Sequence, residues 1–208
     1  MSNTRPRVAV VDHGAGNLVS IAQALERVGV EVAVVESPDG LSGADGVVLP
    51  GVGSTATVME GIRSHGFEAA LAREERPLLG ICVGMQVLFE TSEEDGAGCL
   101  GILEGVVRRL EEAPKLPHIG WNDLEVTGRS DLYEGVADPV VYFVHSFAPV
   151  PSDPEVVTAT SEYGARFVAG VRAGQVEGVQ FHPERSGTAG LRILSRFVAR
   201  CQEAARVA

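Results

Sequence analysis

Short apolar runs alternate with helical patterns in the first half of the chain, and this alternation limits the possible folds more than any other feature. The runs are continuous rather than alternating apolar and polar, which is typical of parallel strands covered on both faces. Between the runs, apolar residues recur at helical spacing, and Asn17 can cap the first helix while Gly29 ends it. Strands are expected at 8–11, 30–35, 47–49 and 78–81, and helices at 18–28, 55–65, 67–73 and 83–90.

The second half of the chain has a different pattern, in which strand candidates follow one another with little helix between them. These candidates lie at 105–110, 140–145, 167–172 and 176–181, and a helix is expected at 188–205. Such strands predict antiparallel additions to the sheet. We therefore expect one α/β domain over residues 1–208, with a mixed, largely parallel central sheet, helices on both faces and antiparallel extensions.

Charge and cysteine usage exclude several classes of protein. The net charge of −11 argues against nucleic-acid binding and against adsorption to anionic membranes, both of which need a basic surface. No apolar stretch has the length of a membrane span or a signal-peptide core. Three widely spaced cysteines indicate reduced thiols in a cytoplasmic protein. The five histidines lack the spacing of metal ligands, so we expect no metal site.

Residues 78–86, LLGICVGMQ, place Cys82 between an apolar strand and a helix, with Gly80 and Gly84 on its two sides. A strand, a sharp turn and a helix with small residues two positions before and after the central residue form a nucleophile elbow. The start of a helix also favours the thiolate over the thiol. An inert buried cysteine is the alternative for this motif by itself.

Residues 178–184, GVQFHPE, supply a general base for that thiol. In an extended segment His182 and Glu184 would project to the same side, and Pro183 disfavours helix at the histidine. The carboxylate can then hold the imidazole in one tautomer while its other nitrogen faces the sulfur. If the two strands are neighbours in a parallel sheet, the three residues meet at its carboxyl edge as a Cys-His-Glu triad.

A glycine-rich turn, Pro50-Gly51-Val52-Gly53, follows the third strand and belongs at the same edge. Glycines on both sides of Val52 allow backbone N–H groups to turn toward a developing oxyanion. The N–H of Val83, directly after the candidate nucleophile, would be a second donor. An ordinary Pro-Gly turn is the alternative reading of this motif alone.

Together these motifs resemble the class I, triad-type glutamine amidotransferases. The chain is most similar to the glutaminase subunits of imidazole glycerol phosphate synthase, on motifs spread over most of its length: DHGAGN (12–17), PGVGS (50–54), GICVGMQVLFETSEE (80–94), PHIGWN (117–122) and YFVHSF (142–147). The resemblance implies a flavodoxin-like fold and no cofactor. It also implies that L-glutamine is hydrolysed to glutamate and ammonia, and that the ammonia passes to a (β/α)₈-barrel cyclase in a heterodimer of histidine biosynthesis.

The resemblance also assigns roles to individual positions. Cys82 would be the nucleophile, His182 the base and acid, and Glu184 the orienting carboxylate. The oxyanion hole would be formed by Gly51, Val52, Gly53 and Val83; glutamine would be held by Gln86, Glu94 and the backbone at Ser146 and Phe147; and the partner interface would include His13, Asn17, His118, Trp121, Asn122, Tyr142 and His145. By residue type alone Trp121 would be a core residue, and His118 and His145 could be structural.

Four positions depart from the usual family pattern. His13 and Phe147 stand where tyrosine is common, Val83 where leucine is common and Arg185 where lysine is common. Val83 and Phe147 would contribute backbone, so only partner contacts at His13 and Arg185 are affected.

Four alternatives remain open at this point. A glutaminase serving another synthase shares the triad. Gly14-Ala15-Gly16 after the first strand, with Glu36 ending the second, resembles a dinucleotide-binding fingerprint, but its third glycine would fall on Val19. An idle interaction subunit is disfavoured because all three triad residues are present, and a free-standing cysteine hydrolase is the fourth alternative.

Overall fold

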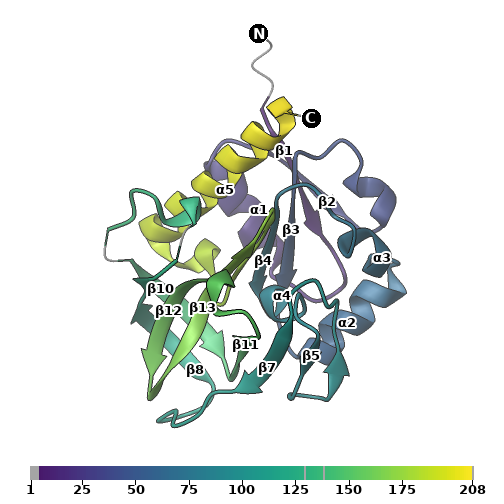
Figure 1. The fold of residues 1–208 in the computed structure, drawn as a ribbon. Helices are drawn as coiled ribbons and strands as arrows, with labels where there is room; N and C mark the ends of the chain where they lie inside the picture. The colour runs from purple at the N-terminus through teal and green to yellow at the C-terminus, as the bar shows by residue number, and fades with distance from the viewer. Residues whose placement is uncertain (1–4, 129, 138, 208) are drawn as a thin grey trace.

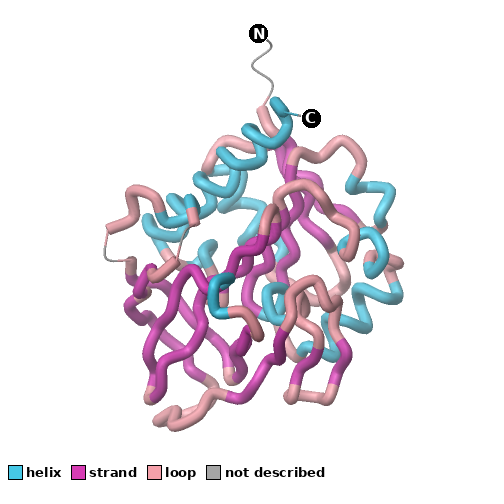
Figure 2. Tube along the Cα trace, viewed as in Figure 1, coloured by secondary structure: helices cyan, strands magenta, loops and turns pink. Residues whose placement is uncertain are grey.

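The central feature of the computed structural model, which describes residues 5–128, 130–137 and 139–207, is an eight-stranded mixed sheet (Figures 1 and 2). Its strand order is β2-β1-β3-β4-β14-β13-β12-β9. The strands from β2 to β14 run parallel, and the last three are added antiparallel. The parallel strands are β1 (Arg7–Val11), β2 (Glu31–Val35), β3 (Gly46–Gly51), β4 (Leu78–Cys82) and β14 (Val176–Val179).

The apolar runs of the sequence form the buried middle of this sheet. Every residue of β3, β4 and β14 is buried, as expected for strands covered on both faces, whereas β2 at the edge is mostly accessible. The chain steps from β1 to β2 in one direction and from β3 to β4 in the other. Right-handed crossovers therefore place α1 (Leu18–Arg27) and α2 (Thr55–Ser64) on opposite faces. Figure 1 shows α5 (Gly187–Val207) beside α1, and α3 (Glu68–Leu71) beside α2.

The second half of the chain builds more than an extension of the central sheet. Strands β9 (Glu125–Val126), β12 (Val157–Tyr163) and β13 (Ala165–Ala173) extend it antiparallel, as predicted. Two predicted strands instead join separate small sheets. The sheet β10-β8 pairs Val140–His145 with His118–Asp123, and the sheet β11-β7-β5-β6 contains Phe147–Pro151, Gly105–Arg109, Thr91–Ser92 and Ala97–Gly98.

The helix expected at 83–90 is shorter in the structure, where α4 spans Val83–Gln86. The reason lies in the following turn, because the carbonyl oxygens of Val87 and Leu88 accept hydrogen bonds from Leu100 and Ile102 instead of continuing the helix. Short 3₁₀ turns complete the described chain at Pro38–Leu41, Asp131–Tyr133, Pro154–Val156 and Pro183–Arg185. Among the described residues, no helix is long and apolar enough to cross a membrane.

The carboxyl ends of the parallel strands meet at one edge of the sheet, and the sequence motifs gather there. The Gly14–Gly16 turn follows β1, the Pro50–Gly53 turn follows β3, and Cys82 ends β4. His182 lies three residues beyond the end of β14, the neighbour of β4. Because the strand order reverses between β1 and β3, this edge is where an open α/β sheet binds its ligands.

Candidate active site

Cys82 lies in a strained turn between β4 and α4. Its backbone has φ 56° and ψ −113°, a conformation that an L-residue adopts only when its surroundings impose it. A Cβ on Gly80 would lie 2.7 Å from the carbonyl oxygen of Gly84, and a Cβ on Gly84 would lie 1.9 Å from that of Leu49. The two glycines are therefore required because backbones pass too close for any side chain.

The short helix after the cysteine gives it less support than the sequence indicated. Because α4 has only four residues, its dipole is weak. Two side chains contribute more, since His182 interacts with the sulfur and the amide Nε2 of Gln180 donates to it at 3.6 Å. The sulfur also lies 3.7 Å from the carbonyl oxygen of Val144.

His182 and Glu184 are in contact, although the local backbone differs from the extended segment predicted. His182 is extended, but Pro183–Arg185 forms a 3₁₀ turn that brings the Glu184 carboxylate back to the ring. The distance from Nδ1 of His182 to Oε1 of Glu184 is 2.9 Å, and both side chains are buried. The histidine backbone is held on both sides, because its N–H donates to Tyr142 and its carbonyl oxygen accepts from the Ser186 hydroxyl.

The protonation of His182 is set by opposing effects. Burial by itself lowers the pKa of this imidazole, but its hydrogen bonds to Cys82 and Glu184, with their charges, raise the pKa to about 10. The ring is therefore protonated at neutral pH. An imidazolium beside the sulfur can stabilise negative charge on it, and the thiolate is the nucleophilic form of cysteine.

A cavity of about 340 Å³ opens over the sulfur, large enough for a small polar substrate. Its wall includes most residues expected at the site: Asn17, Val52, Gly53, Cys82, Val83, Glu94, His145, Ser146, His182 and Glu184. Pro117, Val144 and Arg185 complete the lining. Three residues expected at the site are not part of this wall: Gly51, Gln86 and Phe147.

These three residues lie directly behind the wall. Gly51 ends β3 in register with Cys82, and a Cβ there would lie 2.5 Å from the backbone nitrogen of Gly84. Gln86 is buried, and its Nε2 donates to the carbonyl oxygen of Phe147 at 2.9 Å and to Oε1 of Gln180 at 3.0 Å. The amide nitrogen of Gln86 is thus already paired within the protein.

Glu94 belongs both to the cavity and to the turn after β3. Its Oε2 accepts from the backbone N–H of Thr55, at the start of α2, at 3.0 Å. The preceding turn contains Gly53 at φ 89°, a conformation suited to glycine, and Val52 with its side chain 38% exposed. The carboxylate is therefore held close to the oxyanion segment, at the start of the helix that follows it.

Three of the seven predicted interface residues, His13, His118 and His145, are buried within the chain, so they present little surface to a partner. Their side chains are at most 5% exposed. His13 turns inward because its Nε2 pairs with the carbonyl oxygen of Pro50 at 2.7 Å. His118 and His145 hydrogen-bond to each other at 3.2 Å between Nδ1 and Nε2.

The other four predicted interface positions are accessible, and Trp121 and Tyr142 share one face of the β10-β8 sheet. Trp121 is 56% exposed rather than part of the core, and its ring packs edge-on against Tyr142 of the neighbouring strand β10. The Arg185 guanidinium, which also lines the cavity, lies 5.1 Å from the centre of the Tyr142 ring. Asn17 is exposed at the cavity rim.

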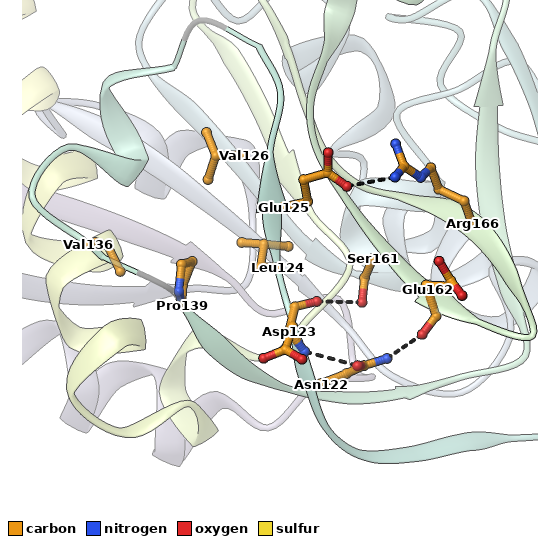
Figure 3. A pocket seen from close by; sticks show the side chains of 10 residues that line it. All are labelled: Asn122, Asp123, Leu124, Glu125, Val126, Val136, Pro139, Ser161, Glu162 and Arg166. Atoms are coloured by element: carbon orange, nitrogen blue, oxygen red, sulfur yellow. Dashed lines mark hydrogen bonds and ion pairs between the residues drawn. The ribbon is translucent and has the colours of Figure 1, made fainter.

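A larger cavity, of about 520 Å³, is lined by residues of β8, β9 and β12 (Figure 3). It contains Asn122, whose Nδ2 donates to the backbone of Glu162 at 2.7 Å, and its rim carries an ion pair of 2.8 Å between Glu125 and Arg166. This cavity contains no nucleophile, so we place the candidate active site at Cys82 on its chemistry and not on cavity size. In the described part of the chain, no group of three or more His, Cys, Asp or Glu side chains could hold a metal ion.

Gln180 is the site residue that sequence reasoning missed. It is fully buried, and it contacts both Cys82 and Gln86. The available signal was its position in GVQFHPE, two residues before His182. A buried polar side chain at the end of a strand needs hydrogen-bond partners, and here they are the Cys82 sulfur and the Gln86 amide.

Several known proteins are similar to this chain in sequence or in structure. The family model for glutamine amidotransferase class-I matches residues 9–201. The chain is 44% identical over 195 residues to the imidazole glycerol phosphate synthase subunit HisH of Dehalococcoides mccartyi, covering 91% of this chain and 95% of that protein. It is 41% identical over 199 residues to the chloroplastic imidazole glycerol phosphate synthase hisHF of Arabidopsis thaliana, covering 92% of this chain and 34% of that protein. A crystal structure of a glutamine amidotransferase matches with a TM-score of 0.73 at 27% identity, covering 94% of this chain and 98% of that one.

We predict that Gly84→Ala destabilises the protein by roughly 3 kcal/mol, because the new methyl group would meet the backbone oxygen of Leu49, which cannot move aside. Urea unfolding followed by circular dichroism measures the change. Gly98→Ala is the matched control, since a Cβ there meets nothing within 4 Å. Equal stability of the two variants would contradict the close backbone approach.

Proposed function

The chain belongs to the class I glutamine amidotransferase family, and from this premise we infer that it is the glutaminase subunit of an imidazole glycerol phosphate synthase. It hydrolyses the side-chain amide of L-glutamine and supplies ammonia for histidine biosynthesis. The observation that carries this function is the geometry at Cys82: a strained turn presents the sulfur to a histidine that is held by Glu184 at 2.9 Å. Membership of this family removes the dinucleotide-binding alternative, and Gly14–Gly16 is the turn that leads to Asn17 at the cavity rim.

The reaction that we propose begins with attack of the Cys82 thiolate on the side-chain carbonyl carbon of glutamine. The carbonyl oxygen of the tetrahedral intermediate becomes an oxyanion, which backbone N–H groups at Val52 and Val83 can stabilise. His182 gives its proton to the leaving nitrogen, so ammonia departs and a thioester remains. His182, now neutral, takes a proton from water, which attacks the thioester and releases glutamate and the thiolate.

We propose that the substrate's backbone groups bind at the opposite end of the cavity. The Glu94 carboxylate is held by the Thr55 N–H and lines the cavity, so it suits the positively charged α-amino group. The backbone at Ser146 and Phe147 is the proposed site for the α-carboxylate. Gln86 would act from behind, because its Nε2 already fixes the Phe147 carbonyl oxygen.

The proposed partner is a (β/α)₈-barrel cyclase that docks on the face around Trp121. Large apolar side chains are exposed on this face at Ile119, Trp121 and Val140, next to Tyr142. Exposed apolar patches of this kind mark interaction sites. The Arabidopsis relative adds support, because this chain covers only 34% of it and the remainder has room for a further domain. We also propose a cytoplasmic location, in keeping with the three free cysteines.

A partner would also provide control over the reaction. Free ammonia in neutral water is mostly protonated, so glutamine hydrolysis without a waiting acceptor is wasteful. Glycines flank Val52, and a rotation of this peptide would move an oxyanion donor into or out of the cavity at small steric cost. Loss of one such donor costs roughly a hundred- to a thousandfold in rate. We therefore propose that the cyclase, with its nucleotide substrate bound, favours the active arrangement.

We predict that Cys82→Ala abolishes glutamine hydrolysis by the complex and leaves the fold intact, because the change removes one small atom from a well-packed turn. Glutamate release and circular dichroism measure the two effects. Synthesis from added ammonium is the control, and it should continue because only the ammonia source is lost. Glutamine turnover near the wild-type rate would refute the nucleophile assignment.

We predict that Glu184→Gln lowers turnover by roughly 10²- to 10⁴-fold, since the imidazole loses the carboxylate that orients it. The acid form of His182 is needed to release ammonia, so the wild-type rate should fall as pH rises through about 10. Glu184 helps to raise the pKa of His182, and its replacement should move this fall to lower pH. The measurement is kcat/KM against pH for both enzymes, and coincident alkaline limbs would contradict the role of Glu184.

We predict that Trp121→Ala weakens cyclase binding by about 30-fold or more, because a large exposed aromatic at the centre of an interface typically contributes about 2 kcal/mol. Calorimetry with the purified cyclase measures the Kd. Val34→Ala is the control, since Val34 is 47% exposed on β2, the edge strand of the central sheet, and belongs to a different sheet from β8 and β10. An unchanged Kd for Trp121→Ala would place the interface elsewhere.

A further inference from the structure

Gln180 is a buried polar side chain that the reaction described above does not use. It follows β14 directly, its exposure is 0%, and its backbone N–H donates to Ala169 at 2.9 Å. Its side-chain Nε2 donates to the sulfur of Cys82 at 3.6 Å, within the range of a hydrogen bond to sulfur. Burying an amide is costly unless it is hydrogen-bonded, so a polar side chain at this buried position suggests a role beyond filling space.

Some groups around the Cys82 sulfur favour the thiol, and others favour the thiolate. The carbonyl oxygen of Val144, 3.7 Å from the sulfur, can accept a hydrogen bond from the thiol but would repel the thiolate. Gln180 and His182 do the opposite, because their N–H groups stabilise a negative sulfur. Negative charge on the sulfur can therefore be stabilised by both donors, and not by the histidine alone.

The amide of Gln180 is held with its nitrogen toward the sulfur. Gln86 donates its Nε2 to Oε1 of Gln180 at 3.0 Å and to the carbonyl oxygen of Phe147 at 2.9 Å. That carbonyl also accepts from Nδ1 of His145 at 2.9 Å, and His145 in turn accepts from His118. If the Gln180 amide turned over, its NH₂ group would face the NH₂ group of Gln86, and its oxygen would face the thiolate.

We propose that Gln180 is a further catalytic residue, whose amide N–H stabilises and orients the Cys82 thiolate; this inference rests on the proposed role of Cys82 as nucleophile. The hydrogen bond acts at two points of the reaction. It increases the fraction of thiolate before attack on glutamine. When water has added to the thioester, the carbon–sulfur bond breaks, its electron pair returns to sulfur, and the Gln180 N–H receives the anion again.

The test is the pH dependence of Cys82 alkylation by iodoacetamide in the Gln180→Met variant, compared with the wild type. Methionine is similar in length and removes the donor. We expect the pH of half-maximal alkylation to rise by on the order of one unit, since a hydrogen bond to a charged group is lost. Turnover of glutamine by the complex should fall at least tenfold, with the loss mainly in kcat.

Cys99 gives an internal reference in the same measurement, because it lies outside the site and burial raises its pKa to about 11. Peptide mass spectrometry separates the two cysteines, and the Cys99 profile should be identical in both proteins. Gln180→Glu is the second variant. It keeps an acceptor for Gln86 but places a carboxylate beside the sulfur, so its alkylation profile should move at least as far upward.

Several outcomes would overturn the inference. If Gln180 only fills space, Gln180→Met would lower the melting temperature and leave the Cys82 profile in place. If Gln180→Met does not fold, an unchanged profile in Gln180→Glu would contradict the proposal equally. The result is separable from the proposed function, because alkylation needs no substrate. A shifted profile in a protein that fails to hydrolyse glutamine would support the role of Gln180 and refute the assigned reaction.

Discussion

The contact on which the rest of the site depends is the close approach of the α4 backbone to the ends of β3 and β4. Gly51, Gly80 and Gly84 have no side chains, and a Cβ on any of them would fall within 3 Å of the neighbouring backbone. This approach forces the turn that holds Cys82 at φ 56°. Because β3 and β4 are neighbours with Gly51 opposite Cys82, the same packing places the oxyanion segment after β3 beside the nucleophile at the end of β4.

Burial at this edge of the sheet gives the charges their effect. His182 would lose its proton easily in an apolar environment, but Glu184 and Cys82 keep its pKa near 10. His145, with a similar degree of burial and no carboxylate partner, has its pKa lowered to about 3. Two histidines within one site thus have opposite protonation, and the difference is the presence of an anionic partner. The protonated ring acts on the sulfur, and the neutral ring supports the backbone of β11 through Phe147.

Much of the site could be predicted from local sequence. The spacing of Gly80, Cys82 and Gly84 indicates the elbow because a strained turn needs small neighbours on both sides. The expectation that His182 and Glu184 meet was confirmed, although through a 3₁₀ turn rather than an extended segment. The sequence did not predict strands such as β8 and β12. Both contain many polar residues, and β8 belongs to a sheet of only two strands. Their apolar pattern is therefore too weak to distinguish them from loops.

The order of strands and helices in the first half of the chain, the elbow, and the Cys82, His182 and Glu184 motifs follow from the sequence alone, because they depend on periodicity and on spacing within a few residues. Which side chains are buried and which partners they meet follows only from the tertiary fold. Gln180 and Cys82 are 98 positions apart, and their contact exists because β14 pairs with β4. Likewise His118 and Trp121 lie three residues apart on β8, yet one is buried and the other faces outward. Alternation along a strand predicts opposite faces, but only packing against other strands determines which face is the interior.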